Sequence, residues 1–210
     1  MLMAAIGEVR GNFSALQAVL GAIEDSGIQT IIQTGNIGSS PSSAETVIAF
    51  FRNSRIPGVQ GEFDRLLGRF ERKRAALLKR LEAAEYAALE SAHAALSSAS
   101  LEFLRALPRQ RRLDVDGVSV LACYGAVTGA SGILTAETPH VKFQREREAA
   151  LADVVVCGGA PEPFSRLVEH TLFVSPGPLN AGPGQARYAV ISTEEEPWSA
   201  EFPVVPCSEG

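Results

Sequence analysis

Blocks of apolar residues alternate with amphipathic segments along the first part of the chain. The apolar run Leu2–Ile6 is typical of a buried strand, and Gln29–Gln33 and Ile56–Gln60 predict two more strands. Between these strands, apolar residues recur at helical spacing in Asn12–Asp25 and in Ala44–Asn53. Strands that alternate with helices in this way predict a parallel sheet with right-handed crossovers.

The middle of the chain has a different pattern. The segment Asp64–Ala106 is rich in Ala, Leu, Arg and Glu and carries no strand signal, so it predicts two or three helices that end before Pro108. The basic run Arg69–Arg74 is interpreted as a solvated helix face, with an anion-binding rim as the alternative. We therefore predict a helical insertion over about residues 64–107.

The last part of the chain is rich in strand signals. Asp116-Gly117 lies between the strand-like runs Leu113–Val115 and Val118–Cys123, which predicts a hairpin. Thr138–Ala150 is expected to be a charged helix, and Gly177–Gly184 a loop. Further strands are expected at Asp153–Cys157, Phe164–Val168, Leu172–Ser175, Tyr188–Ser192 and, at an edge, Glu201–Val205. We interpret residues 1–210 as a single α/β domain that contains the helical insertion.

Composition narrows the class of protein. The chain has 210 residues, of which 46% are hydrophobic and 20% charged, as in globular proteins. A net charge of -5 gives no electrostatic reason to expect nucleic acid as a partner. No apolar stretch approaches the ~20 residues of a membrane helix, and the N-terminus does not resemble a signal peptide. Cys123, Cys157 and Cys207 form neither a paired framework nor a metal-type spacing, so we expect a reducing cytoplasm.

Five loops that follow predicted strands hold the candidate chemistry. Ligand-binding residues gather at such strand ends in α/β sheets. The loops are Gly7–Asn12, Gly35–Gly38, Gly61–Asp64, Tyr124–Gly125 and Gly158–Phe164. In this order they resemble the motif blocks of the metallophosphoesterases (calcineurin-like phosphoesterases), which read Asp-x-His-Gly-Asn, Gly-Asp, Gly-Asn-His-Asp, His-Gly and Gly-His-x-His-x-Pro-Phe.

Two further segments, Leu104–Pro108 and Ser175–Pro178, also match that family, so the resemblance covers nearly the whole chain. It is closest to the small bacterial phosphodiesterase branch with a helical insertion. The resemblance implies a four-layer αββα sandwich, in which two mixed sheets stack and helices cover the outside. Members of the family also associate often, which leaves a homo-oligomer open.

Enzymes of this family hold two divalent metals such as Mn²⁺, which activate a bridging water and clamp the phosphate. The metal ligands are replaced here. At the matching positions this chain has Glu8 for Asp, Arg10, Phe63, Tyr124, Gly159 and Pro161 for His, Asn36 for the bridging Asp and Glu62 for Asn, whereas Asn12 and Asp64 are retained. None of the three histidines, His93, His140 and His170, falls on a motif position. These replacements therefore predict that no metal cofactor is held, and we assign no catalytic residue.

The replacements predict a different electrostatic arrangement. Arg10 is expected to place its guanidinium between Glu8 and Glu62, with Asn36 and Tyr124 hydrogen-bonded around the ion pairs. One alternative is that these side chains point into solvent without pairing. A second is a site for Mg²⁺ or Ca²⁺ made from the oxygens of Glu8, Asn36 and Glu62, against which the cation of Arg10 argues.

These residues predict a catalytically inactive, metallophosphoesterase-like protein that acts as a binding or regulatory pseudoenzyme. The alternative is a divergent phosphoesterase or hydrolase with a reduced or altered metal site. The expected partner is a small molecule in the inherited cleft or a protein on the helical insertion, and neither nucleic acid nor a membrane is expected.

Overall fold

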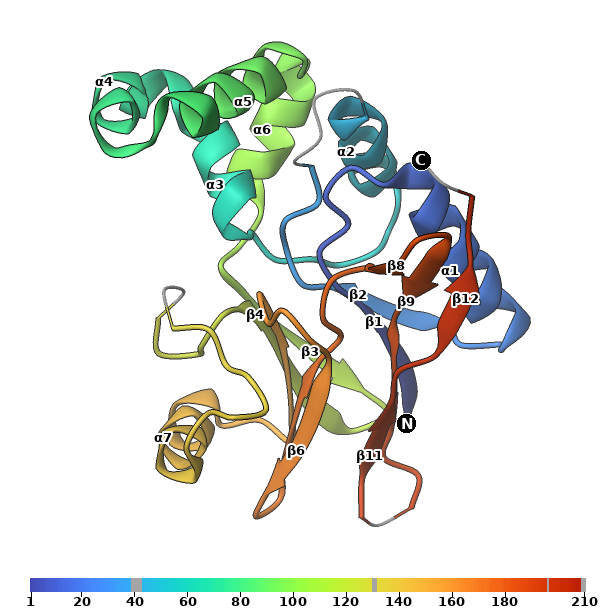
Figure 1. The fold of residues 1–210 in the computed structure, drawn as a ribbon. Helices are drawn as coiled ribbons and strands as arrows, with labels where there is room; N and C mark the ends of the chain where they lie inside the picture. The colour runs from blue at the N-terminus through green and yellow to red at the C-terminus, as the bar shows by residue number, and fades with distance from the viewer. Residues whose placement is uncertain (39–42, 130–131, 196, 209–210) are drawn as a thin grey trace.

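Two β-sheets stacked face to face form the centre of the molecule (Figure 1). The computed structural model describes residues 1–38, 43–129, 132–195 and 197–208. The first sheet has the order β11-β10-β1-β2 and consists of β1 (Leu2–Ile6), β2 (Thr30–Gln33), β10 (Ala189–Ser192) and β11 (Ser199–Glu201). The second sheet has the order β3-β4-β5-β7-β6 and consists of β3 (Gln110–Val115), β4 (Val118–Tyr124), β5 (Val154–Gly158), β6 (Phe164–Val168) and β7 (Thr171–Ser175).

Both sheets are mixed. Strand β1 pairs parallel with β2 and antiparallel with β10. In the second sheet β5 pairs parallel with β4 and β7, whereas the pairs β3–β4 and β6–β7 are antiparallel. A third, smaller sheet lies beside the first, in the order β12-β9-β8. Its strands are β8 (Asn180–Gly182), β9 (Gln185–Arg187) and β12 (Val204–Pro206).

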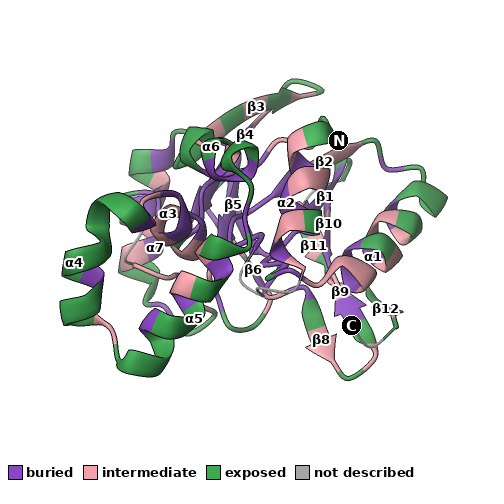
Figure 2. Ribbon diagram, turned by 90° about the horizontal axis from the view of Figure 1, so that it is seen from above, coloured by how far each residue is buried: buried purple, intermediate pink, exposed green. Residues whose placement is uncertain are grey.

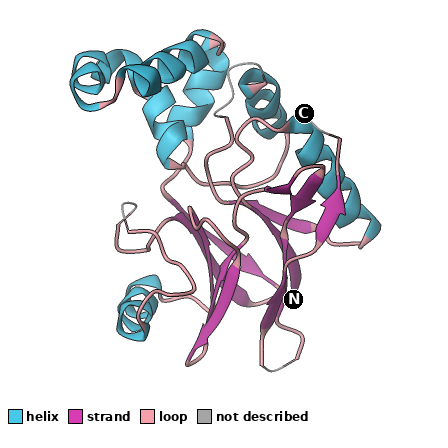
Figure 3. Ribbon diagram, viewed as in Figure 1, coloured by secondary structure: helices cyan, strands magenta, loops and turns pink. Residues whose placement is uncertain are grey.

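Helices cover the outer faces of the two large sheets (Figure 3). Helices α1 (Phe13–Asp25) and α2 (Ala44–Asn53) share a core with the outward face of the first sheet, and α7 (His140–Ala150) packs on the second sheet through Phe143. Because successive residues of a strand face opposite sides, Met3 packs between the sheets while Ala4 packs under the helices. The predicted αββα sandwich of two mixed sheets is confirmed.

Four helices form the segment between α2 and β3, where two or three were predicted. They are α3 (Glu62–Gly68), α4 (Phe70–Arg80), α5 (Ala83–Ala94) and α6 (Ser98–Ala106). They lie beyond one end of the sandwich, next to α2, and contribute Leu67, Leu89 and Leu104 to the core shared with α1 and α2. The outer turns of α4 and α5 are exposed, in contrast to the buried strands (Figure 2). Across the described residues, no helix has both the length and the apolar character to span a membrane.

Three predicted elements differ from the structure. Ile56–Gln60 forms only a single bridge to β2, at Gly58, where the N–H of Val59 donates to Gln33. The next N–H on the side of β2 is that of Gly61, and it donates to the carboxylate of Asp64 instead. The predicted edge strand Glu201–Val205 is two strands, β11 and β12, which belong to different sheets and are separated at Phe202-Pro203. The predicted loop Gly177–Gly184 contains β8.

Candidate functional site

The loops that follow β1 and β2 lie side by side at one end of the first sheet. The backbone N–H groups of Arg10 and Gly11 donate to the carbonyls of Asn36 and Ile37, at 3.0 Å and 2.9 Å. Arg10 and Asn36 both adopt a left-handed backbone conformation, with φ of 50° and 54°. This pairing turns the two loops toward each other, so their side chains meet.

Glu8 is the centre of the site. Its side chain is only 2% exposed, and its Oε2 atom accepts three hydrogen bonds. Arg10 donates two of them, from Nε at 2.9 Å and from Nη2 at 2.7 Å. Asn36 donates the third from Nδ2 at 3.0 Å. The Arg10 side chain is 61% exposed, so its guanidinium covers the buried carboxylate on the solvent side.

Asn36 connects four segments of the chain. Its Nδ2 donates to Glu8 and also to the phenolic oxygen of Tyr124 at 2.9 Å, while its Oδ1 accepts from the backbone N–H of Phe63 at 2.8 Å. An amide can act as donor and acceptor at once, whereas an ionised Asp at this position could only accept. The asparagine is therefore matched to a site in which its neighbour Glu8 supplies a carboxylate acceptor.

Tyr124 lies at the end of β4 and is buried against the same group of residues. Burial raises the pKa of its phenol to about 12, and the carboxylate of Glu8 acts in the same direction. The phenol therefore stays protonated at neutral pH, and it holds Asn36 rather than acting as an anionic ligand.

Asp64 is fully buried and ties the loop after β2 to the start of α3. Its Oδ2 accepts from the backbone N–H groups of Asn36 at 2.7 Å and Gly61 at 2.9 Å, and its Oδ1 accepts from Ile37 at 3.0 Å. Burial raises the pKa of Asp64 to about 6, and these N–H donors oppose that shift. In this chain Asp64 holds backbone in place, while its neighbour Phe63 packs against the core.

The predicted cluster of Glu8, Arg10 and Glu62 is only partly present. Glu62 is the first residue of α3, its side chain is 59% exposed, and it lies 3.8 Å from Arg65 one helical turn later. No ion pair joins Arg10 to Glu62 in the part of the chain that the structure describes. Arg10 therefore pairs with Glu8, while Glu62 lies near Arg65 of its own helix.

The remaining candidate residues are Asn12, Gly159 and Pro161. Asn12 caps α1, since its Oδ1 accepts from the N–H of Ala15 at 3.0 Å. Gly159 has a φ of 92°, and a Cβ atom there would meet the side chain of Ile133 at 2.5 Å. Pro161 is exposed in the loop after β5. None of these three positions offers a free ligand atom to the centre of the site.

A cavity of about 20 Å³ borders Tyr124 on the side of α3. It is lined by Gln60, Gly61, Glu62, Arg65, Arg109 and Tyr124. A volume of that size holds about one water molecule. The sequence analysis did not single out Gln60, Arg65 or Arg109, because none of them occupies a motif position.

These residues do not fit the two-metal centre that the motif series implies. Protein N–H groups already occupy Oε2 of Glu8 and both carboxylate oxygens of Asp64. A metal bonded to Oε2 would stand next to the guanidinium of Arg10, at a cost in charge repulsion. Within the described residues, no three or more His, Cys, Asp or Glu side chains are grouped so that they could share a metal ion.

Several solved structures superpose on almost the whole length of this chain. A hypothetical protein, PH1004, from Pyrococcus horikoshii superposes with a TM-score of 0.83 at 19% identity, over 99% of this chain and 89% of its own. A metallophosphoesterase from Sphaerobacter thermophilus has a TM-score of 0.72 at 19% identity, with the same coverage. Vps29 of Entamoeba histolytica, solved in complex with zinc, has a TM-score of 0.53 at 12% identity, over 98% of this chain and 99% of its own. At these identities the likeness concerns the fold.

The family is established at the level of sequence. A comparison with curated proteins found no match. The model of the calcineurin-like phosphoesterase superfamily domain, however, matches residues 1–196, which include all five loops. This protein therefore belongs to the calcineurin-like phosphoesterase superfamily.

Proposed function

We propose that this protein is a binding or regulatory pseudoenzyme, which keeps the phosphoesterase fold and hydrolyses no phosphoester. The observation that carries the proposal is the environment of Glu8. Its buried Oε2 atom accepts hydrogen bonds from Arg10 and Asn36 at the position where the family's first motif supplies a metal ligand. The fixed charge of Arg10 thus balances the carboxylate that a metal would otherwise balance.

The chemistry of hydrolysis supports the same proposal. The reaction of the family needs a water activated by metal and an acid for the leaving group. Phe63 offers no proton at the position of the family's acid. The three histidines lie elsewhere: His93 stacks on Phe70 in the insertion, His140 begins α7, and His170 lies in the turn between β6 and β7. No residue that the loops bring together replaces an imidazole base.

A protein partner on the helical insertion is a better match to this structure than a small molecule in the inherited cleft. The cavity beside Tyr124 holds about one water molecule, which is too little space for a metabolite. The helical insertion instead offers the exposed faces of α4 and α5, on which a partner or a second copy of the chain could dock. Size-exclusion chromatography with light scattering distinguishes a monomer from a self-associated form.

A reducing compartment such as the cytoplasm remains our proposal for the location. Cys123 and Cys157 are buried and free. Burial raises the pKa of Cys123 to about 12 and that of Cys157 well above its usual value, so both thiols stay protonated and unreactive.

The decisive experiment combines metal binding with turnover. We expect no stoichiometric metal after purification, no saturable heat of binding with Mn²⁺, Mg²⁺ or Ca²⁺, and no hydrolysis of bis(4-nitrophenyl) phosphate above the buffer rate with Mn²⁺ present. Two variants complete the design: Glu8→Gln at the site, and Glu102→Gln on the exposed face of α6 as a matched control.

Turnover that depends on Mn²⁺, and that disappears in Glu8→Gln but persists in Glu102→Gln, would overturn the proposal. That result would favour the alternative, a divergent phosphoesterase or hydrolase with a reduced site. The observation in favour of this alternative is the retention of Asp64, which still orders the loop that carries Asn36.

A further inference from the structure

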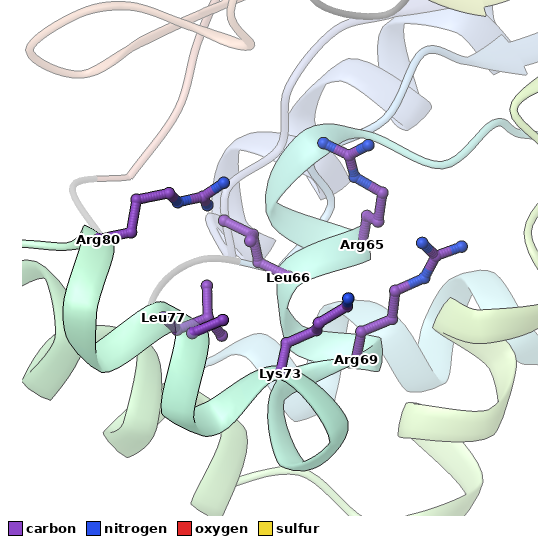
Figure 4. A pocket seen from close by; sticks show the side chains of 7 residues that line it. Arg65, Leu66, Arg69, Lys73, Leu77 and Arg80 are labelled. Carbon is purple, nitrogen blue, oxygen red and sulfur yellow. The ribbon is translucent and has the colours of Figure 1, made fainter.

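A basic recess lies between α3 and α4; of the residues that line it, Arg65 also borders the small cavity beside Tyr124. Its volume is about 280 Å³. Four cations surround it, namely Arg65, Arg69, Lys73 and Arg80, and its apolar floor includes Leu66 and Leu77 (Figure 4). We call this recess the α3–α4 groove.

Most of the charge in the groove is not compensated. Arg65 lies 3.8 Å from Glu62, but no side-chain hydrogen bond or ion pair involves Arg69, Lys73 or Arg80 within the described residues. Nearby basic residues behave differently: Arg74 pairs with Glu90, and Arg105 donates to the carbonyl of Gly68. Cations that line one recess without partners create a positive potential, which an anion would relieve.

The sequence concentrates this charge locally. Residues 65–80 contain seven Arg or Lys and one Glu, although the whole chain carries a net charge of -5. A solvated helix face in an acidic protein would more often mix both signs. The alternative interpretation of the run Arg69–Arg74 as an anion-binding rim therefore gains a structural basis in the groove.

We propose that the α3–α4 groove binds a small organic phosphate monoester with an apolar substituent. Guanidinium groups bind phosphate oxygens in a bidentate manner, and a phosphate monoester carries a charge of about −1.5 to −2 near neutral pH. The substituent would lie on Leu66 and Leu77 at the floor of the groove. The volume of the groove is near the lower end of the roughly 300–1,000 Å³ of small-molecule pockets, which favours a compact ligand.

The shape and the lining of the groove disfavour nucleic acid and anionic membranes as its ligand. A single-stranded nucleic acid stacks its bases on exposed aromatic side chains, but Phe70, at the start of α4, is buried. An anionic membrane presents a flat surface, to which cations around a recess are poorly matched. The inference does not depend on the inactivity of the Glu8 site, since none of the residues that hold Glu8 lines the groove.

Isothermal titration with phenyl phosphate, at constant ionic strength, tests the proposal. We expect saturable 1:1 binding of phenyl phosphate and weaker binding of inorganic phosphate. Arg69→Ala and Arg80→Ala should each weaken binding about tenfold, the effect of one charge-assisted hydrogen bond. Leu66→Ala should weaken the binding of phenyl phosphate and leave that of inorganic phosphate unchanged.

Lys79→Ala is the matched control, because Lys79 is exposed in α4 next to Arg80 but does not line the groove. Equal weakening by Lys79→Ala and Arg80→Ala would mean a general charge effect and would overturn the proposal. An absence of saturable phenyl phosphate binding in the folded wild-type protein would also overturn the proposal. The same holds if the protein binds only an acidic peptide or only anionic phospholipid vesicles. Hydrolysis of bis(4-nitrophenyl) phosphate is measured separately, so a failure here is distinguishable from a failure of the pseudoenzyme proposal.

Discussion

At the scale of single residues, the substitutions in the motif loops form one connected set. Asn36 can donate to Glu8 only because it is an amide, and Glu8 can be buried only because Arg10 and Asn36 donate to it. The identity of the replaced residues could be read from the sequence. Their pairing could not be read from the sequence. The partner of a side chain such as Glu62 depends on its position in the helix, which the sequence does not specify.

Asn36→Asp is expected to destabilise the protein by about 1–3 kcal/mol at pH 7, because it removes the donor to Glu8 and places a second carboxylate beside it. Urea denaturation followed by circular dichroism measures the effect. The control is Asn180→Asp in β8, where the exposed side chain acts as an acceptor to the N–H of Gly182 and an Asp can do the same. Similar stabilities of the two variants would contradict the account of Asn36.

Asp64 predicts a dependence of stability on pH. Its folded pKa of about 6 exceeds the value of about 3.9 for an unfolded chain, so the folded state binds the proton more tightly. The contribution of Asp64 is therefore largest below about pH 4, falls as the pH rises to about 6, and is constant above that. The stability of the wild type relative to Asp64→Asn should fall by about 2–3 kcal/mol over this window.

The measurement is urea denaturation at several pH values, with Asp25→Asn, at the exposed end of α1, as the control. The control should show no such fall relative to the wild type. If the stability of the wild type relative to Asp64→Asn instead rises with pH, the three N–H donors lower the pKa of Asp64 by more than burial raises it.

At the scale of elements, the sequence predicted the boundaries of the first two helices well. Helix α2 has the predicted bounds, and α1 differs only in that the predicted first residue, Asn12, is its N-cap. The strand expected at Ile56–Gln60 was wrong for a reason outside the segment, since the N–H of Gly61, which would continue the pairing with β2, bonds to Asp64 instead. Local periodicity identifies an element, but pairing partners decide whether an extended segment becomes a strand.

Asn12 gives a test at this scale. Asn12→Ala should cost about 1 kcal/mol of stability, because its side chain caps α1 through the N–H of Ala15. The matched control is Ser43→Ala, since Ser43 precedes α2 and makes no side-chain cap. Thermal denaturation of both variants compares them. An equal loss in the two would contradict a capping role for this motif residue.

At the scale of the whole molecule, the close approach of the two large sheets is a feature that the glycines make possible. Gly158 ends β5 of the second sheet, and a Cβ atom there would lie 2.3 Å from the carbonyl oxygen of Thr34, which follows β2 of the first sheet. The contact is with backbone, so rotation of a side chain cannot relieve it. The position of Gly158 is therefore set by the packing of one sheet on the other.

Gly158→Ala is expected to destabilise the protein by about 1–3 kcal/mol through this overlap. Gly21→Ala in α1 is the matched control, because nothing lies within 4 Å of a Cβ atom there, and it should stabilise the helix by roughly 0.5–1 kcal/mol. Denaturant unfolding compares the two variants. If Gly158→Ala leaves the free energy of unfolding unchanged, the sheets can move apart at this point without a loss of stability.

The sequence by itself determined the α/β class, because that follows from periodicity. The αββα sandwich was predicted from the resemblance to the family, and the replaced residues at the motif positions could be read from residue identity at fixed places along the chain. Only the tertiary structure decided that Arg10 pairs with Glu8, that Asn36 joins four segments and that four cations surround a groove between α3 and α4. Those features depend on which side chains meet once distant segments, or two successive helices, have packed. The geometry of packing, rather than local preference, selects each partner.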